Sequence, residues 1–317
     1  MQIVVGLPVN EKHKKVLASH AGNAQLVYKP LKELTAPDIM DAEIVVGNMD
    51  KTLLPYAQKL RLLQLNSAGA DAYIKPGVFP GNAFLCNATG AYGLALSEHM
   101  LGMLLAMMKK LYLYYDNQKQ GLWQDEGPVT SIYGAKVLVV GMGNIGSTFA
   151  EKAHALGAHV TGIKRRSTTV PPYADAMGTM EHLDEYLSQS DIIVTSLPGT
   201  AATLHLFNKE RFTAMKQGAY FLNIGRGSAV VTDDLCAALK DGHLAGAAVD
   251  VTEPEPLPQN HPAWHTPNLY ITPHISGQYH LAATLDNIVN IAAENIAAYM
   301  NNKPLRNIVD FTTGYKK

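Results

Sequence analysis

Apolar runs alternate with amphipathic, helix-like stretches along the first part of the chain. The apolar runs occupy residues 3–7, 25–28, 43–47, 62–65 and 84–86. Runs of this length between helical patterns are typical of strands that a parallel sheet buries on both faces. The pattern therefore predicts a doubly wound parallel sheet with helices on its two sides.

A second series of apolar runs follows later in the chain. These runs occupy residues 137–140, 160–163, 192–196, 220–224, 247–250 and 269–272. They predict a second parallel sheet in tandem with the first, so we expect an α/β protein with two doubly wound domains. Residues 94–118 predict one long connecting helix that begins near Ser97, and residues 281–300 predict an amphipathic helix that carries the chain back to the first domain.

The run 137–140 is followed by the motif Gly141-x-Gly143-x-x-Gly146 and then by a helical pattern. The first glycine permits a tight turn, the second lets backbone N–H groups approach a pyrophosphate, and the third lets helix and strand pack closely. A bound anion then lies at the positive end of the helix. A glycine-rich turn that binds nothing is the alternative, but the flanking strands and helix favour a dinucleotide-binding site.

The next predicted strand ends in Lys164-Arg165-Arg166-Ser167. NAD-binding units usually carry an acidic residue about 20 residues beyond the glycines, where it accepts hydrogen bonds from the adenosine ribose. A carboxylate repels a ribose 2′-phosphate, whereas fixed cations and a hydroxyl bind it through charge-assisted hydrogen bonds. The cluster therefore favours NADP(H), with NAD(H) and a merely solvated basic turn as alternatives.

Composition narrows the class of protein. The 317 residues are enough for two domains, and the apolar and charged fractions, 47% and 17%, are those of an ordinary globular protein. A net charge of -1 provides no overall field that attracts nucleic acid or an anionic membrane. Any binding must therefore be local.

The two cysteines and the first residues of the sequence indicate the cellular compartment that we expect for the protein. Cys86 and Cys236 lack metal-ligand spacing, so we expect two reduced thiols and no metal site. The chain begins with a strand-like run rather than a signal peptide, and the apolar stretch 100–108 is too short to span a bilayer. These features predict a cytoplasmic protein without membrane or nucleic-acid partners.

Three ionisable residues, Arg226, Glu255 and His274, follow apolar strands of the second domain, where ligands of parallel sheets bind. Reduction of a 2-keto acid needs a cation for the carboxylate, a proton donor for the developing alkoxide and a hydride source. Arg226 can bind the carboxylate, and His274 can supply the proton because imidazole titrates near neutrality. Glu255 can orient the ring and favour its protonated form. Asp250 can accept a hydrogen bond from the nicotinamide carboxamide.

Each of these residues also has a plain structural interpretation. Arg226, flanked by glycines, can simply bridge a turn; Glu255, flanked by prolines, can be a solvated loop acid; and His274 is one of 12 histidines. Only the combination favours a catalytic site. In the first domain, the loop 66–71 can receive a substrate carboxylate on its backbone N–H groups, or can be an ordinary turn. Residues 87–92 can border the same cleft or form an interdomain hinge, and we favour the hinge.

With these segments identified, the chain resembles the D-isomer-specific 2-hydroxyacid dehydrogenases, which include glyoxylate/hydroxypyruvate reductases, phosphoglycerate dehydrogenases and D-lactate dehydrogenases. The resemblance covers nearly the whole chain. The matching segments are 67–71, 97–99, 139–146, 197–198, 223–227, 249–256 and 272–274.

The resemblance implies a domain organisation. A Rossmann cofactor domain, residues 97–286, is inserted into a flavodoxin-like substrate domain formed by residues 1–96 and 287–317. The cofactor domain includes a linking helix, and the segment 97–115 is expected to build a homodimer.

The resemblance also implies roles for individual residues. Arg226, Glu255 and His274 are the expected catalytic residues, and Ser67, Ala68 and Gly69, together with Arg226 and His274, are expected to bind the substrate. The expected cofactor contacts are Gly141, Gly143, Asn144, Ile145, Gly146, Lys164, Arg165, Arg166, Ser167, Leu197, Pro198, Thr203, Ile224, Gly225, Asp250 and Gly277. Many NAD-using members carry Asp where this chain has Lys164, so NAD dependence does not follow from the resemblance.

We therefore expect an oxidoreductase that transfers a hydride between NADPH and a small 2-keto acid to give a D-2-hydroxy acid. Two other functions stay open. The same fold serves as a dinucleotide-sensing corepressor in the C-terminal-binding proteins, and other family members oxidise small anions such as formate or phosphite. The complete set Arg226, Glu255 and His274 favours catalysis.

Overall fold

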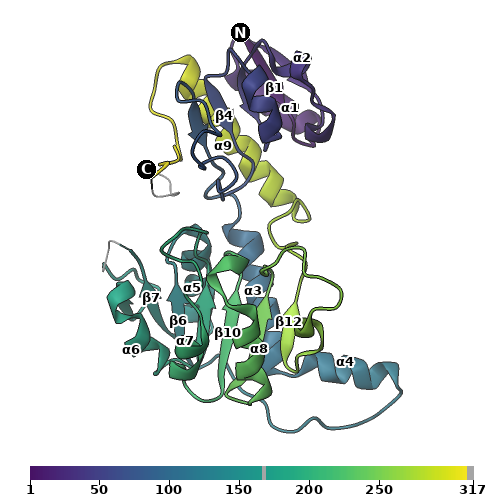
Figure 1. Cartoon of the computed structure of the whole chain (residues 1–317), viewed down its shortest axis with the longest axis vertical. Helices are drawn as coiled ribbons and strands as arrows, with labels where there is room; N and C mark the ends of the chain where they lie inside the picture. Colours follow the sequence, from purple (N-terminus) through teal and green to yellow (C-terminus); the bar gives the residue numbers. More distant parts are fainter. Residues whose placement is uncertain (166–168, 313–317) are drawn as a thin grey trace. The chain divides into compact units, whose positions relative to one another are not determined.

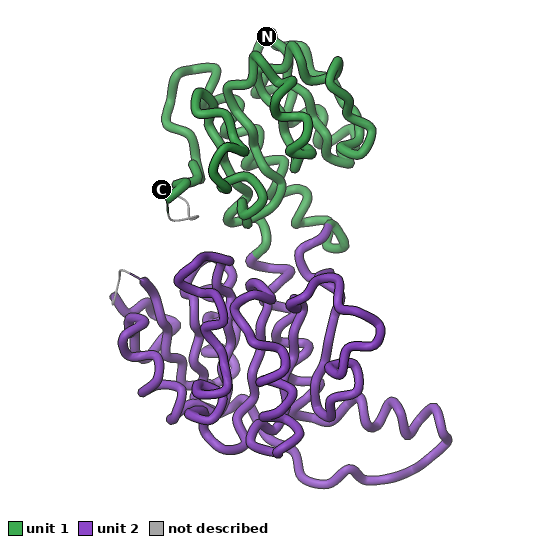
Figure 2. Tube along the Cα trace, in the orientation of Figure 1, with its two compact units in different colours: residues 1–92, 279–317 green, residues 93–278 purple. Residues whose placement is uncertain are grey.

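The computed structural model describes residues 1–165 and 169–312, and these form two compact units. Unit 1 contains residues 1–92 and the chain from Tyr279 onward, and unit 2 contains residues 93–278 (Figure 2). The first unit is therefore built from both ends of the chain, with the second inserted into it.

Unit 1 contains a five-stranded parallel sheet of order β2-β1-β3-β4-β5, which is the flavodoxin-like order. The strands are β1 (Gln2–Val5), β2 (Gln25–Tyr28), β3 (Ala42–Val46), β4 (Leu62–Gln64) and β5 (Phe84–Cys86). Its helices are α1 (Glu11–His20), α2 (Ala36–Ile39) and α9 (Ala282–Met300), with short 3₁₀ turns η1 (Leu31–Glu33) and η2 (Lys51–Tyr56). Helices α1 and α9 lie side by side (Figure 1). The five predicted strands and the C-terminal helix are confirmed.

Unit 2 contains a seven-stranded parallel sheet of order β12-β11-β10-β9-β6-β7-β8. The strands are β6 (Lys136–Val140), β7 (His159–Ile163), β8 (Ala176–Gly178), β9 (Ile192–Thr195), β10 (Ala219–Asn223), β11 (Leu244–Val249) and β12 (Leu269–Ile271). The first six in chain order reproduce the Rossmann arrangement, and β12 extends it. Strand β8 was not predicted, because its three residues, Ala-Met-Gly, include no β-branched or aromatic side chain.

Helices flank this sheet on both faces (Figure 1). The helices of unit 2 are α3 (Gly93–Met108), α4 (Leu111–Lys119), α5 (Asn144–Ala155), α6 (Leu183–Leu187), α7 (Lys209–Ala214) and α8 (Thr232–Lys240), with 3₁₀ turns η3 (Met180–His182), η4 (Gly227–Ala229) and η5 (Pro262–His265). Of these, α4 extends away from the sheet (Figure 1). Side chains of β6, β9 and β10, such as Leu138, Ile193 and Phe221, form the buried core with residues of α6, α7 and α8.

The predicted single helix over residues 94–118 is wrong. The chain forms two helices, α3 and α4, separated by Lys110, whose φ of 54° lies in the left-handed region. A residue in that region ends the helical hydrogen-bond ladder. Helix α3 also begins before Ser97, at Gly93, where a Cβ would lie 2.7 Å from Thr148 Oγ1 of α5. Its first turn therefore packs against α5.

The chain passes between the units at residues 92/93 and 278/279, rather than at the expected 96/97 and 286/287. The first difference follows from the packing of Gly93 on α5. The second arises because residues before 287 already bind unit 1: Asn66 donates to the Tyr279 hydroxyl over 2.6 Å, and Asp286, in the first turns of α9, accepts from Lys12 and His13 over 2.8 and 2.6 Å.

Candidate active site

The glycine turn between β6 and α5 has the geometry of an anion site. Gly141 has a φ of 105°, which side chains rarely tolerate, and a Cβ on Gly146 would lie 2.1 Å from the Gly141 carbonyl oxygen. Gly143 is the N-cap of α5, provides no capping side chain, and has no atom within 4 Å of where its Cβ would be. The space beside Gly143 is therefore open and no side chain caps the first turn of α5, so these residues fit a dinucleotide pyrophosphate.

Lys164 and Arg165 are exposed side chains that directly follow β7. The backbone N–H groups of Gly141 and Met142 both donate to the Ile163 carbonyl, over 3.0 and 3.1 Å. These bonds fix the glycine turn beside Ile163, the last residue of β7. Lys164, the first residue of the basic pair, is the next residue in the chain. Arg166 and Ser167 of the predicted cluster lie outside the described residues.

The loop after β9 carries the expected cofactor contacts Leu197, Pro198 and Thr203. The Thr203 hydroxyl is buried, donates to the Pro198 carbonyl over 2.7 Å and accepts from the Thr200 N–H over 2.9 Å. Thr203 thus shapes this loop through its own hydrogen bonds.

Arg226 lies in a turn that the end of β10 organises. The Asn223 side chain accepts from the Gly225 N–H over 3.0 Å and donates to the Arg226 carbonyl over 2.9 Å. The Arg226 guanidinium donates to the Gly225 carbonyl over 2.9 Å. Asn223 therefore holds both sides of the turn. The Arg226 side chain that extends from this turn is half-buried.

The glycines beside Arg226 are needed for packing between loops. A Cβ on Gly225 would lie 2.4 Å from the Leu197 carbonyl oxygen, and one on Gly227 would lie 1.8 Å from the Thr252 carbonyl oxygen. The sequence interpretation linked these glycines to the approach of a ligand. The structure shows that they let the loop with Arg226 contact the loops after β9 and β11.

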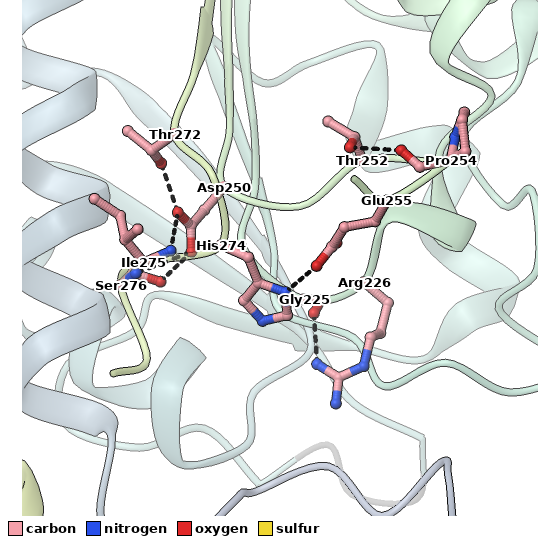
Figure 3. A network of polar contacts seen from close by, with 10 residues as sticks. All are labelled: Gly225, Arg226, Asp250, Thr252, Pro254, Glu255, Thr272, His274, Ile275 and Ser276. Carbon is pink, nitrogen blue, oxygen red and sulfur yellow. Dashed lines mark hydrogen bonds and ion pairs between the residues drawn. The ribbon is translucent and has the colours of Figure 1, made fainter. Parts of the chain in front are cut away.

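His274 and Glu255 form a hydrogen-bonded pair. The His274 Nδ1 and Glu255 Oε1 atoms are 2.5 Å apart, and the two side chains are 46% and 41% exposed. Figure 3 shows the Glu255 carboxylate pointing at the ring, whose Nε2 is turned away from it. Among the described residues Nε2 has no hydrogen-bond partner, so it is the nitrogen available to hold or transfer a proton.

Asp250 follows β11, and its carboxylate is buried within the loop that carries His274 (Figure 3). Its Oδ1 accepts from Thr272 Oγ1 and the Ile275 N–H over 2.6 and 3.0 Å. Its Oδ2 accepts from the hydroxyl and the N–H of Ser276 over 2.5 and 3.2 Å. The four donors account for the usual acceptor capacity of a carboxylate. Gly277, another expected cofactor contact, directly follows this loop.

The expected substrate loop, Ser67, Ala68 and Gly69, belongs to unit 1, whereas Arg226, Glu255 and His274 belong to unit 2. The Ser67 hydroxyl donates to the Gly69 carbonyl over 2.6 Å, which leaves the loop's backbone N–H groups as its expected ligand donors.

Asn66, directly before this loop, is anchored by side chains that the sequence interpretation had not assigned. Asn48 and Asn66 exchange hydrogen bonds between side-chain oxygens and backbone N–H groups, over 2.6 and 3.0 Å. The Tyr92 hydroxyl donates to the Asn66 carbonyl. Burial raises the pKa of Tyr92 and Tyr279, so both phenols stay protonated near the loop. Tyr92 and Tyr279 lie far from Asn66 in the sequence, so no local sequence pattern predicted these contacts.

The structure also describes the two cysteines. Both cysteines are free and buried, and burial raises the pKa of the Cys86 thiol to about 12. The residues that the structure describes contain no cluster of three or more side chains suited to a metal ion. Among the same residues, no helix is long and apolar enough to cross a membrane.

A Rossmann sheet with a glycine turn, a histidine–glutamate pair and an arginine at the strand ends defines the class of dinucleotide-dependent oxidoreductases. The model of the "D-isomer specific 2-hydroxyacid dehydrogenase, NAD binding domain" matches residues 101–276. The chain belongs to the D-isomer-specific 2-hydroxyacid dehydrogenase family, and it is accordingly an NAD(P)-dependent oxidoreductase of 2-hydroxy acids.

Individual relatives cover most of the chain. Glyoxylate/hydroxypyruvate reductase A of Serratia proteamaculans is 31% identical over 255 residues, which are 78% of this chain and 79% of that protein. The crystal structure of a D-isomer-specific 2-hydroxyacid dehydrogenase family protein from Aeromonas salmonicida has 33% identity and a TM-score of 0.88, covering 98% and 99% of the two chains. An NADPH-dependent glyoxylate/hydroxypyruvate reductase of Sinorhizobium meliloti, solved with NADP and sulfate, has 25% identity and a TM-score of 0.84, covering 99% of both.

Proposed function

We propose that the protein uses NADPH to reduce a small 2-keto acid, of the size of glyoxylate or hydroxypyruvate, to a D-2-hydroxy acid. The observation that carries the proposal is the 2.5 Å contact between His274 Nδ1 and Glu255 Oε1, which leaves Nε2 available. This contact is the arrangement expected of an imidazole acid whose orientation a carboxylate fixes.

Each residue has a distinct part in the proposed reduction. Bound NADPH supplies the hydride to the carbonyl carbon. His274 Nε2 donates a proton to the developing alkoxide, and Glu255 stabilises the positively charged ring. Arg226 binds the substrate carboxylate through its planar guanidinium. In unit 1, the loop Ser67–Gly69 offers backbone N–H groups as donors to an anion.

The cofactor preference rests on the end of β7. Lys164 and Arg165 are exposed there, directly after the residue that anchors the glycine turn. Two cations at this point attract a ribose 2′-phosphate and give no acceptor for a free ribose hydroxyl. The NADP complex of the Sinorhizobium meliloti reductase supports this preference, and the reductase names among the relatives support the substrate class.

We also propose that the protein forms a homodimer through the region that includes α4. Figure 1 shows α4 extending away from the sheet of unit 2. Leu111, Tyr115 and Leu122 are 55%, 60% and 49% exposed, and Trp123 is fully exposed. Contiguous exposed apolar side chains of this kind mark interaction surfaces, and a second copy of the chain is the expected partner.

The cofactor proposal predicts a selective loss. Replacing Lys164 and Arg165 by Gln should lower kcat/KM for NADPH by at least about tenfold and change that for NADH by less than about threefold, because only NADPH carries the 2′-phosphate. Steady-state kinetics with both cofactors measures this. The exposed pair Lys59 and Arg61 of unit 1, changed to Gln, is the charge-matched control. Equal losses for both cofactors, or a wild-type preference for NADH, would contradict the proposal.

The acid/base proposal predicts separate effects at His274 and Glu255. His274→Ala should lower kcat by about 10²–10⁴-fold, the usual contribution of general acid catalysis, while NADPH still binds. Glu255→Gln should move the high-pH limb of the reduction profile to lower pH, because the protonated ring loses its negative partner. His205→Ala, which removes another histidine paired with a glutamate in unit 2, is the control. An unchanged pH profile in Glu255→Gln excludes Glu255 from this role.

Arg226 should act on the substrate rather than as a structural bridge. Arg226→Lys keeps a charge but loses the planar fork, so it should fold normally, keep NADPH affinity and lose about 2–5 kcal/mol of transition-state stabilisation toward a 2-keto acid. Melting temperature, NADPH fluorescence titration and kcat/KM measure these three properties. Unfolding of the variant, or wild-type turnover across a panel of 2-keto acids, is the outcome that favours the structural bridge.

The dimer proposal predicts that sedimentation velocity gives about twice the chain mass at micromolar concentration. Changing Tyr115 and Trp123 together to Ser should raise the monomer fraction, since both side chains lose apolar area. Tyr56→Ser, at a 52% exposed tyrosine of unit 1, should leave the dimer intact. A monomeric wild-type protein refutes this part of the proposal.

A further inference from the structure

His274 has an unusual backbone conformation. Its φ is 51°, in the left-handed region that non-glycine residues rarely adopt. Such a conformation persists only where surrounding contacts enforce it. Since the direction of the imidazole depends on this backbone, the contacts that hold residues 272–276 also set where Nε2 points.

Asp250 supplies these contacts from both its backbone and its side chain. Its carbonyl accepts from the His274 N–H over 2.8 Å, and its carboxylate accepts from residues on either side of His274. Thr272 Oγ1 lies before the histidine and contacts Oδ1 over 2.6 Å. The Ser276 hydroxyl and N–H lie after it and contact Oδ2. One buried carboxylate therefore accepts hydrogen bonds from both ends of the strained turn.

A second histidine completes this network from outside the loop. His99, on α3, places Nε2 3.1 Å from Thr272 Oγ1 and 3.9 Å from Asp250 Oδ1. The threonine has a single hydroxyl proton, and the shorter contact with the carboxylate shows where that proton goes. The hydroxyl must then accept from His99, so Nε2 of His99 carries a hydrogen.

We infer that His99 and Thr272 are positioning residues, which hold the turn of His274 through the directed chain His99 Nε2–H to Thr272 Oγ1–H to the Asp250 carboxylate. The inference rests on the proposed role of His274. His99 and Thr272 take no direct part in the proposed proton transfer. Neither side chain has to touch the substrate.

The arrangement explains why a histidine occupies this position on α3. Its side chain is 22% exposed and faces a carboxylate that is 1% exposed. His99 orients the Thr272 hydroxyl toward that carboxylate, and loss of this hydroxyl donor costs more than loss of an ordinary surface contact, because the buried acceptor cannot recover the bond from water. The loop with His274 is then free to leave its strained conformation, and the fraction of enzyme with a correctly aimed Nε2 falls.

The test compares variants that keep or remove each link. Thr272→Val has nearly the shape of threonine without the hydroxyl, and His99→Leu removes the donor; each should lower kcat by about tenfold, with the KM of the keto acid changed by less than about threefold. Thr272→Ser and His99→Gln retain a hydroxyl and an N–H, and should recover most of the rate. Glu98→Gln, the neighbouring exposed residue of α3, should match the wild type.

A double-variant cycle tests whether the hydrogen bonds from His99 through Thr272 to Asp250 act together. If His99 acts through Thr272, the variant with both His99→Leu and Thr272→Val should be no slower than Thr272→Val alone. Losses that multiply instead, or wild-type kcat in both single variants, overturn the inference.

Hydrogen exchange of the ligand-free protein gives a readout that does not depend on turnover. The peptide covering residues 272–278 should exchange faster in Thr272→Val and His99→Leu than in the wild type, and at the wild-type rate in Glu98→Gln. Unchanged exchange in the first two variants also overturns the inference. Failure of the proposed function is a different result: wild-type protein and His274→Ala with equal turnover of every 2-keto acid, whatever the loop variants do.

Discussion

The active-site region of unit 2 depends on backbone segments that approach each other more closely than any side chain permits. A Cβ at Gly146 would lie 2.1 Å from the Gly141 carbonyl oxygen of its own turn, and a Cβ at Gly225 or Gly227 would lie 2.4 or 1.8 Å from a carbonyl oxygen of a neighbouring loop. The contacts of Gly225 and Gly227 bring the loops after β9, β10 and β11 together at one edge of the sheet, and a Cβ on Gly141 of the turn after β6 would lie 3.2 Å from Leu197 of the loop after β9. The dinucleotide turn, the arginine and the glutamate can occupy that edge because glycine stands at each crossing.

Two carboxylates at this edge have opposite environments, and the environments suit different tasks. Asp250 is buried and accepts four hydrogen bonds from the loop that follows β12, so its charge organises backbone. Glu255 is 41% exposed and its contact is the imidazole of His274. A charge that must respond to proton transfer is better placed where solvent reaches it, whereas a charge that fixes geometry gains from exclusion of water.

Family membership defines the class of reaction, whereas the cofactor preference and the substrate are proposed from local residues. The family defines a dinucleotide-dependent oxidoreductase of 2-hydroxy acids. Our proposal of NADPH rests on a few residues after β7, the basic Lys164 and Arg165. Our proposal for the substrate involves the loop 66–69 of unit 1, where Asn66 forms hydrogen bonds with Asn48, Tyr92 and Tyr279. Both properties can therefore change within a constant fold.

The sequence by itself determined the two parallel sheets and the glycine turn, and it identified Arg226, Glu255 and His274 as candidate site residues, because apolar runs and strand-end motifs are local patterns. It did not determine strand β8, whose Ala-Met-Gly sequence contains no β-branched or aromatic residue, or the break at Lys110, which depends on one backbone angle. The contact of Glu255 with His274 was expected from the sequence, whereas only the tertiary structure joined His99 to Thr272, 173 residues away, and to Asp250. Such contacts depend on side-chain direction and on which strands are neighbours, and neither property is written in any short segment of the chain.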